Sequence, residues 1–175
     1  MKITLVRHTA PDVPAGVCYG QSDVPLKESF ETEAAHVAEA LKGHCFDRVF
    51  TSPLTRCVRL ASYCGYAHAQ RDERLMEMNF GDWEMQRYDS ITDPGLQVYY
   101  HDWLHTPATG GESFEKVYRR VSAFLDELCK EPCTNVLLFT HGGVISCAKL
   151  YAGRATIETL FDNPLPYGAV LTLEI

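Results

Sequence analysis

At 175 residues the chain is long enough to bury a hydrophobic core without disulfides or a structural metal, and we expect residues 1–175 to form a single domain. Its 23 acidic and 16 basic residues give a net charge of −7 without any run of Lys or Arg, which argues against nucleic acid as the main partner. No apolar stretch approaches the roughly 18 residues that a membrane-spanning helix needs, so we expect no membrane partner either.

The beginning of the chain predicts a strand, a loop and a helix. Residues 3–6 are apolar and partly β-branched, which predicts a buried strand. Pro and Gly recur through residues 11–20 and indicate a long loop. Apolar side chains then recur at helical spacing over residues 28–42, and Gly43 stands where a helix commonly ends.

A second strand and a second helix follow. Residues 48–51 have the apolar, β-branched pattern of a strand. Ser52 and Pro53 are typical of a helix N-cap followed by proline at the first helical position. We therefore expect a helix that runs to Tyr63 or Cys64 and is ended by Gly65.

The second half begins with the least regular part of the chain, residues 85–111, where Pro and Gly interrupt mixed polarity. Residues 114–128 then show a clear apolar helix face, and residues 136–139 predict the most deeply buried strand. A helix over residues 144–151 and a last strand over residues 170–173 complete the chain. Because strands alternate with helices, we predict an α/β fold, a three-layer α/β/α sandwich around a mostly parallel sheet.

Three polar motifs stand at the ends of predicted strands. Arg7-His8 follows the first strand, residues 52–56 follow the second and end in Arg56, and His141 comes just after residues 136–139. Ligands of open α/β sheets bind outside the carboxyl ends of the strands. Two Arg and two His can therefore converge there, although they lie far apart in the sequence.

This set of residue types suits a phosphate ligand. Arg binds phosphate oxygens with a planar, permanently charged fork, and an imidazole can act as a covalent nucleophile. Backbone N–H groups at Gly142 and Gly143, at a predicted helix start, can add donors. Each motif alone has a plain structural explanation, such as a helix cap at Ser52 or a surface charge at Arg56, so the hypothesis depends on their joint occurrence.

Together the motifs resemble the histidine phosphatase superfamily, the phosphoglycerate-mutase-like proteins. The matching segments keep the family's order and cover most of the chain, at residues 5–8, 19–26, 51–56, 75–84, 110–114 and 140–143. The resemblance implies a phosphoglycerate-mutase-like fold and a phosphatase that needs neither metal nor cofactor. It also implies a small-molecule phosphate ester as the partner and leaves a homodimer open.

The resemblance assigns a role to each catalytic candidate. His8 is similar to the nucleophile that becomes phosphohistidine. Arg7, Arg56 and His141 are similar to the clamp on the phosphoryl oxygens. Glu77 is similar to the acid that protonates the leaving alkoxide and then acts as the base for water, a contribution of roughly 10²–10⁴-fold in rate.

Other residues follow from the same matching segments. Substrate contacts are implied at Tyr19, Gly20 and Gly142, in addition to the phosphoryl clamp. Three more carboxylates near Glu77 in the sequence compete with it for the acid role: Glu73, Asp82 and Glu84. Of these, Glu73 is the second choice after Glu77.

The chain departs from the common family pattern in ways that point to one branch. Thr9 follows the nucleophile where the family usually has Gly, residues 10–14 supply no Asn, and Met85 replaces a frequent Gly. A phosphate contact of the wider family is therefore missing. Together with residues 18–26, these features resemble the α-ribazole phosphatases, which implies hydrolysis of α-ribazole 5′-phosphate to α-ribazole in cobalamin nucleotide-loop assembly.

Alternative interpretations remain open at this stage. Another phosphatase of the superfamily, acting on sugar phosphates, phosphoglycerate or several esters, would share the same catalytic residues and differ in residues 85–111. A non-catalytic phospho-ligand sensor would keep the fold but needs no nucleophile. A metallophosphatase would need clustered Asp and His ligands, and only His101 and His105, four residues apart, come near such a pattern.

Two further expectations concern residues 85–111 and the cysteines. The aromatic side chains of this segment either stack on the substrate's aromatic base or pack a lid against the body, and the packing interpretation is slightly favoured. The residues are Tyr88, Tyr99, Tyr100 and Trp103. Seven cysteines, an odd number, without an export signal predict free thiols and a cytoplasmic location.

Overall fold

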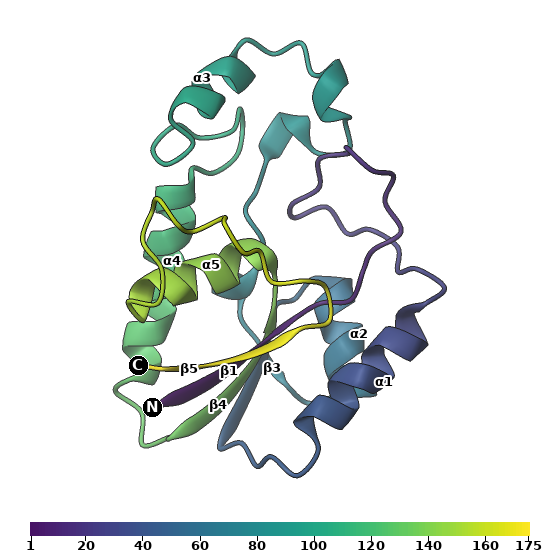
Figure 1. Cartoon of the computed structure of the whole chain (residues 1–175), viewed down its shortest axis with the longest axis vertical. Helices are drawn as coiled ribbons and strands as arrows, with labels where there is room; N and C mark the ends of the chain where they lie inside the picture. The colour runs from purple at the N-terminus through teal and green to yellow at the C-terminus, as the bar shows by residue number, and fades with distance from the viewer.

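A five-stranded sheet runs through the middle of the molecule in the computed structural model, which describes residues 1–175 (Figure 1). The strand order is β3-β2-β4-β1-β5, and β5 at one edge is antiparallel to its neighbour β1. The strands are β1 (Lys2–Arg7), β2 (Arg48–Thr51), β3 (Gln70–Arg71), β4 (Asn135–Thr140) and β5 (Val170–Glu174). All four predicted strands are present, and the sheet is mostly parallel as expected.

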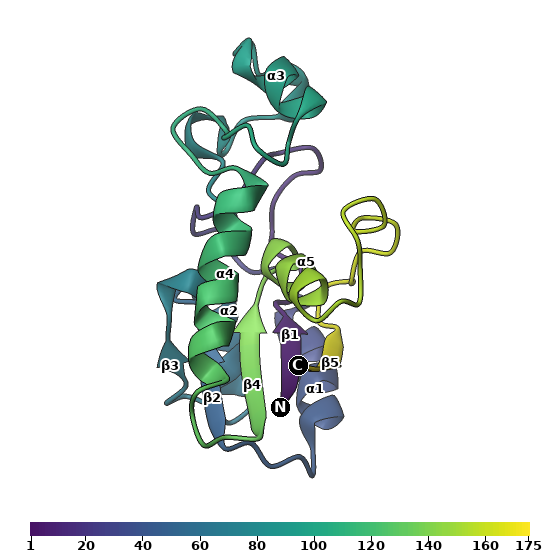
Figure 2. The same ribbon diagram turned by 90° about the vertical axis from the view of Figure 1, so that its left-hand side faces the viewer.

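Four helices cover the two faces of the sheet. Figures 1 and 2 show α1 (Phe30–Leu41) and α2 (Thr55–Tyr63) on one face, with α4 (Phe114–Leu128) and α5 (Gly142–Tyr151) on the other. The three-layer α/β/α arrangement is therefore confirmed. A fifth helix, α3 (Gly95–His101), lies beyond the sheet in the irregular segment. None of these helices is both long and apolar enough to cross a membrane.

The central strand β4 shows why the sheet is buried on both sides. Its Val136 and Leu138 belong to the core under α4 and α5, whereas Leu137 and Phe139 belong to the core under α1 and α2. Successive side chains of a strand point to opposite faces, so a continuous apolar run is what a strand covered on both sides requires. Each of these four residues is at most 1% exposed.

The register between β1 and β4 brings two predicted site residues together. Arg7, the last residue of β1, is paired with Thr140, the last residue of β4. His8 and His141 therefore follow directly at the ends of two adjacent parallel strands. The backbone N–H of His8 donates to the carbonyl oxygen of Thr140 at 3.0 Å. Above this edge lie the irregular segment with α3 and the loop that precedes β5, while both chain ends lie at the opposite edge (Figures 1 and 2).

The start of α2 differs from the prediction. The helix begins at Thr55 rather than at Pro53, and the Ser52 side chain does not serve as its N-cap residue. Asp23 caps it from another loop, since its carboxylate accepts from the backbone N–H of Thr55 at 3.0 Å and from the Thr55 hydroxyl. The Ser52 hydroxyl instead contacts His141 Nε2 at 2.7 Å, so the sequence signal for a cap marks a residue of the site.

Candidate active site

A cavity of about 460 Å³ opens at the carboxyl edge of β1 and β4. Its ionisable floor consists of Arg7, His8 and Glu77, with the backbone of Gly143 beside them. The rest of the lining is apolar or aromatic: Val17, Tyr19, Met78, Phe80, Tyr88, Tyr99, Tyr100, Trp103, Phe114, Val117 and Phe161.

His8 is held as a neutral imidazole with one free nitrogen. It is 2% exposed, and its Nδ1 lies 2.7 Å from the carbonyl oxygen of Thr9. A carbonyl can only accept, so Nδ1 carries the proton. Burial and then the nearby Arg56 guanidinium lower the pKa of His8 to about 3. The ring is therefore uncharged near neutral pH, and Nε2 keeps a lone pair for nucleophilic attack.

The residues before and after His8 in the chain each have a buried polar atom without a hydrogen-bond partner. The guanidinium of Arg7 lies 4.1 Å from the ring centroid of Tyr167 and donates from Nη1 to the carbonyl oxygen of Leu165. Its Nε, however, is buried without a partner, and so is the hydroxyl of Thr9. Because an unsatisfied buried donor is costly, the free Nε of Arg7, a residue of the cavity lining, indicates a place that an oxygen-rich anion can fill.

Arg56 and His141 lie behind His8 rather than in the cavity wall, and both are 0% exposed. Arg56 Nε donates to His141 Nδ1 at 3.3 Å, and its two Nη atoms donate to backbone oxygens of Ser22 and Gly20 at 2.9 and 2.5 Å. A guanidinium has five N–H groups, so two of them remain.

His141 is the second neutral imidazole of the site. Burial, then the neighbouring His8 and Arg56, hold its pKa well below the usual range. Because Nδ1 accepts from Arg56, Nε2 carries the proton toward Ser52. The ring centroids of His141 and His8 are 5.1 Å apart.

The two glycines predicted to contact substrate do not line the cavity but allow close approach of neighbouring groups. Gly20 is outside the cavity lining, and a Cβ there would lie 2.0 Å from the carbonyl oxygen of Met78. Gly142 begins α5, and a Cβ there would lie 3.4 Å from the Arg7 guanidinium. Tyr19, in contrast, contributes its side chain to the cavity wall.

Glu77 is the one carboxylate in the cavity lining. Its Oε2 accepts from the backbone N–H of Gly143 at 3.2 Å, and its Oε1 accepts from the N–H of Met78 at 3.0 Å. A Cβ on Gly143 would lie 2.3 Å from Oε1. Glycine at this position therefore lets the carboxylate approach the start of α5.

The three rival carboxylates lie elsewhere. Glu73 and Asp82 are exposed and do not line the cavity. Glu84 accepts from the backbone N–H groups of Gln21, Ser22 and Phe80 at 2.9, 2.6 and 3.0 Å. Burial raises the pKa of Glu84, but these bonds and one from the Ser22 hydroxyl outweigh burial and hold that pKa below its usual value. Glu84 thus holds the loop at residues 20–22, which Arg56 also binds through the carbonyl oxygens of Gly20 and Ser22.

Comparison with known proteins decides the family. A family model described as "Histidine phosphatase superfamily (branch 1)" matches residues 3–175. The chain belongs to the histidine phosphatase superfamily. This confirms the resemblance inferred from the motifs.

The relatives of this histidine phosphatase include proteins named as phosphatases and proteins named as probable phosphoglycerate mutases. It is 32% identical over 154 residues to the adenosylcobalamin/alpha-ribazole phosphatase of Salmonella typhimurium, covering 83% of this chain and 76% of the relative. It is 29% identical over 141 residues to phosphoserine phosphatase 1 of Hydrogenobacter thermophilus, covering 74% and 65%. The crystal structure of the alpha-ribazole phosphatase from Shigella flexneri superposes with a TM-score of 0.90 at 25% identity, covering 100% and 91%.

The aromatic residues of the histidine phosphatase's irregular segment pack on neighbouring rings and also line the cavity. Tyr99 and Trp103 line the cavity and also pack edge-on, Tyr99 against Trp83 at 5.3 Å and Trp103 against Phe114 at 5.2 Å between ring centroids. Tyr100 lines the cavity while remaining 53% exposed. The packing interpretation is therefore correct for two of these side chains, and all three face the cavity.

Sequence reasoning missed the contribution of the loop before β5. Tyr167 stands over His8 with ring centroids 5.4 Å apart, and its hydroxyl contacts the hydroxyl of Tyr19. Phe161 from the same loop lies in the cavity wall. This loop has neither an apolar period nor a recognisable motif, so only its place above the sheet edge reveals its part in the site.

Proposed function

We propose that this chain is a metal-independent phosphomonoesterase that hydrolyses α-ribazole 5′-phosphate through a phosphohistidine at His8. The single observation that carries the substrate assignment is the aromatic, nearly uncharged cavity that begins directly at His8 and Glu77. The relatives named as α-ribazole phosphatases support it.

In the first step His8 Nε2 attacks phosphorus and the bond from phosphorus to the ester oxygen breaks. The Glu77 carboxyl group gives its proton to that oxygen, which leaves as an alcohol. The Arg7 fork, with its unpaired Nε, stabilises the charge on the phosphoryl oxygens, and the buried positive charge of Arg56 behind His8 supports it from a greater distance. Phosphoryl transfer needs chiefly such positioning and charge stabilisation.

In the second step water replaces the imidazole. The Glu77 carboxylate takes a proton from water, the water oxygen bonds to phosphorus, and the bond from phosphorus to Nε2 breaks. Inorganic phosphate leaves, and His8 returns to its neutral state with Nδ1 still donating to Thr9. One carboxyl group therefore serves as acid and then as base, as microscopic reversibility allows.

The cavity favours a leaving group that carries an aromatic ring and no charge. Apart from Arg7, which is assigned to the phosphoryl group, no cationic side chain lines it, so nothing there pairs with the carboxylate of phosphoserine or phosphoglycerate, or with a second phosphate. Its volume of about 460 Å³ falls within the range of roughly 300–1,000 Å³ that small-molecule sites occupy.

The test is phosphate release from α-ribazole 5′-phosphate compared with phosphoserine, 3-phosphoglycerate, fructose bisphosphate and p-nitrophenyl phosphate, all with EDTA present. We expect α-ribazole 5′-phosphate to lead in kcat/KM by tenfold or more, about 1.4 kcal/mol of discrimination. Equal turnover of all esters would mean a broad-specificity phosphatase. Loss of activity in EDTA with rescue by zinc would refute the metal-independent mechanism.

Covalent catalysis is tested separately from substrate choice. Enzyme quenched in alkali during turnover should contain phosphohistidine, which is stable in alkali and labile in acid, and the His8→Ala variant should contain none. A wild-type protein that binds the ester but forms no phosphohistidine would be a sensor rather than an enzyme. All seven cysteines are free, which supports a reducing compartment such as the cytoplasm for this activity.

A further inference from the structure

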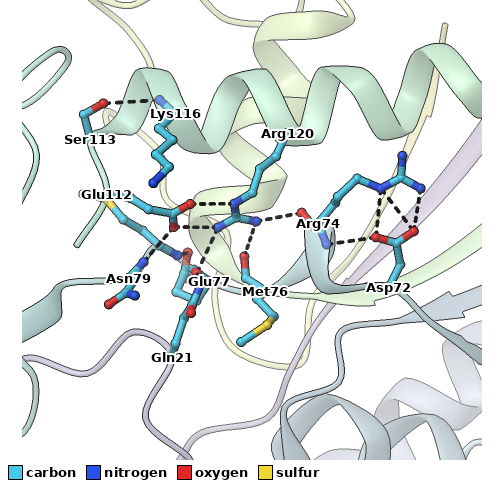
Figure 3. A network of polar contacts seen from close by, with 11 residues as sticks. Gln21, Asp72, Arg74, Met76, Glu77, Asn79, Glu112, Ser113, Lys116 and Arg120 are labelled. Atoms are coloured by element: carbon cyan, nitrogen blue, oxygen red, sulfur yellow. Dashed lines mark hydrogen bonds and ion pairs between the residues drawn. The ribbon is translucent and has the colours of Figure 1, made fainter. Parts of the chain in front are cut away.

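Arg120 on α4 is bonded entirely to the segment that carries Glu77 and to one carboxylate (Figure 3). Its Nη1 donates to the carbonyl oxygens of Arg74 and Met76, both at 2.7 Å. Its Nη2 donates to the carbonyl oxygen of Glu77 at 3.0 Å. One side chain thus collects three backbone oxygens within four consecutive residues.

Glu112 completes the network from the other side. Its two carboxylate oxygens accept from Arg120 Nε and Nη2 at 3.0 and 3.1 Å, and Oε2 also accepts from the backbone N–H of Asn79 at 2.9 Å. The two side chains are 17% and 10% exposed. An Arg–carboxylate pair with two hydrogen bonds and little solvent exposure keeps its geometry better than an exposed ion pair does.

The segment needs such external support because it has no regular structure of its own. After the short 3₁₀ turn Glu73–Leu75, residues 76–80 belong to neither helix nor strand. Backbone carbonyls in a shielded place need donors, and here no sheet ladder supplies them. Arg120 provides them, and Gln21 adds a further bond to the Glu77 carbonyl oxygen at 3.0 Å.

We propose that Arg120, braced by Glu112, is a positioning residue that sets the height of the Glu77 carboxylate over His8 and thereby controls proton delivery to the leaving group. The inference rests on the acid role proposed for Glu77. Arg120 does not line the cavity and touches no substrate, so it acts through the backbone of residues 74–77.

The neighbouring Arg119 provides a matched control. It lies on the same helix and carries the same charge, but its side chain is 75% exposed and pairs with Glu115. Arg119→Gln therefore removes an arginine from α4 without changing the support of Glu77. Exposed pairs of this kind contribute little to stability.

The experiment compares kcat/KM for two esters in Glu77→Gln, Arg120→Gln and Arg119→Gln. α-Ribazole 5′-phosphate has an alkoxide leaving group that needs a proton, whereas p-nitrophenolate leaves readily as an anion. We expect Arg120→Gln to lose about 10- to 100-fold on the alkyl ester and less than about threefold on the aryl ester. Glu77→Gln should show the same pattern with a larger loss, and Arg119→Gln should match wild type.

Glu112→Gln is the second variant, in case Arg120→Gln does not fold. It keeps the shape of the side chain and one acceptor oxygen, so we expect the same selective loss at smaller size. Equal losses on both esters, or no loss in either variant, would overturn the inference while leaving the acid role of Glu77 intact. If Glu77→Gln itself affects both esters equally, the proposed acid assignment fails and the inference fails with it.

Discussion

The close approach of Glu77 to the start of α5 gives a sharp prediction for Gly143→Ala. The added Cβ would lie 2.3 Å from Glu77 Oε1, although contacts of 3.4 Å and more are ordinary for such an atom. The carboxylate must therefore retreat by about 1 Å, and a misplacement of that size costs roughly 10²-fold in rate. We expect kcat/KM for α-ribazole 5′-phosphate to fall about 100-fold, which corresponds to about 2.7 kcal/mol of transition-state stabilisation.

Stability should change in the opposite direction. Gly143 lies inside the first turn of α5, where alanine is favoured over glycine by roughly 0.5–1 kcal/mol. The group that must move is the end of a flexible side chain, so relief of the clash costs little. The thermal midpoint should therefore stay the same or rise while activity falls.

The assay measures kcat/KM on the alkyl ester and on p-nitrophenyl phosphate, together with a thermal melt. Ser146→Ala is the matched control, since it also raises helix propensity in α5 and lies away from Glu77. A Gly143→Ala enzyme with wild-type activity on the alkyl ester would refute the argument, because the position of the carboxylate would then not matter.

Three more predictions follow from other features. The pKa of His8, lowered to about 3, lies below the unfolded value near 6.5, so the unfolded chain binds the extra proton as pH falls below 6.5 and stability decreases, by up to about 2 kcal/mol at pH 5. Urea unfolding at pH 7 and pH 5 should show a smaller difference in His8→Asn. Met85 has a φ of 64°, a left-handed conformation that costs about 1 kcal/mol for a side chain, so Met85→Gly should raise Tm by roughly 2–4 °C in calorimetry, and a lower Tm would contradict this. Tyr100→Ala should raise KM for α-ribazole 5′-phosphate about three- to tenfold through lost ring contact, and an unchanged KM would show that this ring does not touch the substrate.

The fold was predictable where a long buried element gives the sequence a regular apolar pattern. The apolar run of β4 and the apolar face of α4 are covered by other elements along their whole length, and both were predicted nearly to their ends. The strand β3 was missed because it consists of two exposed polar residues paired only with β2. The helix α3 was missed because it buries only Leu96 and because the pair Pro94-Gly95 at its start is typical of a turn.

The site was predictable to the extent that strand ends define it. Parallel strands deliver Arg7-His8 and His141 to one edge, and this follows from strand order alone. Glu77 lies in an irregular segment, and only the family motif singled it out. The sequence does not distinguish the roles of Arg119 and Arg120, because these roles depend on which side of α4 faces residues 74–77.

The cavity draws its reactive floor and its apolar wall from different parts of the chain. The floor comes from the end of β1, the start of α5, and Glu77, which is held against that helix start. A large part of the wall comes from the irregular segment and the loop before β5, which lie outside the three layers (Figure 1). Selectivity can therefore diverge by mutation or grafting of these two segments while the chemistry is inherited unchanged. Chimaeras that exchange residues 85–111 between this enzyme and a phosphoserine phosphatase of the superfamily are a direct route to new substrate preferences.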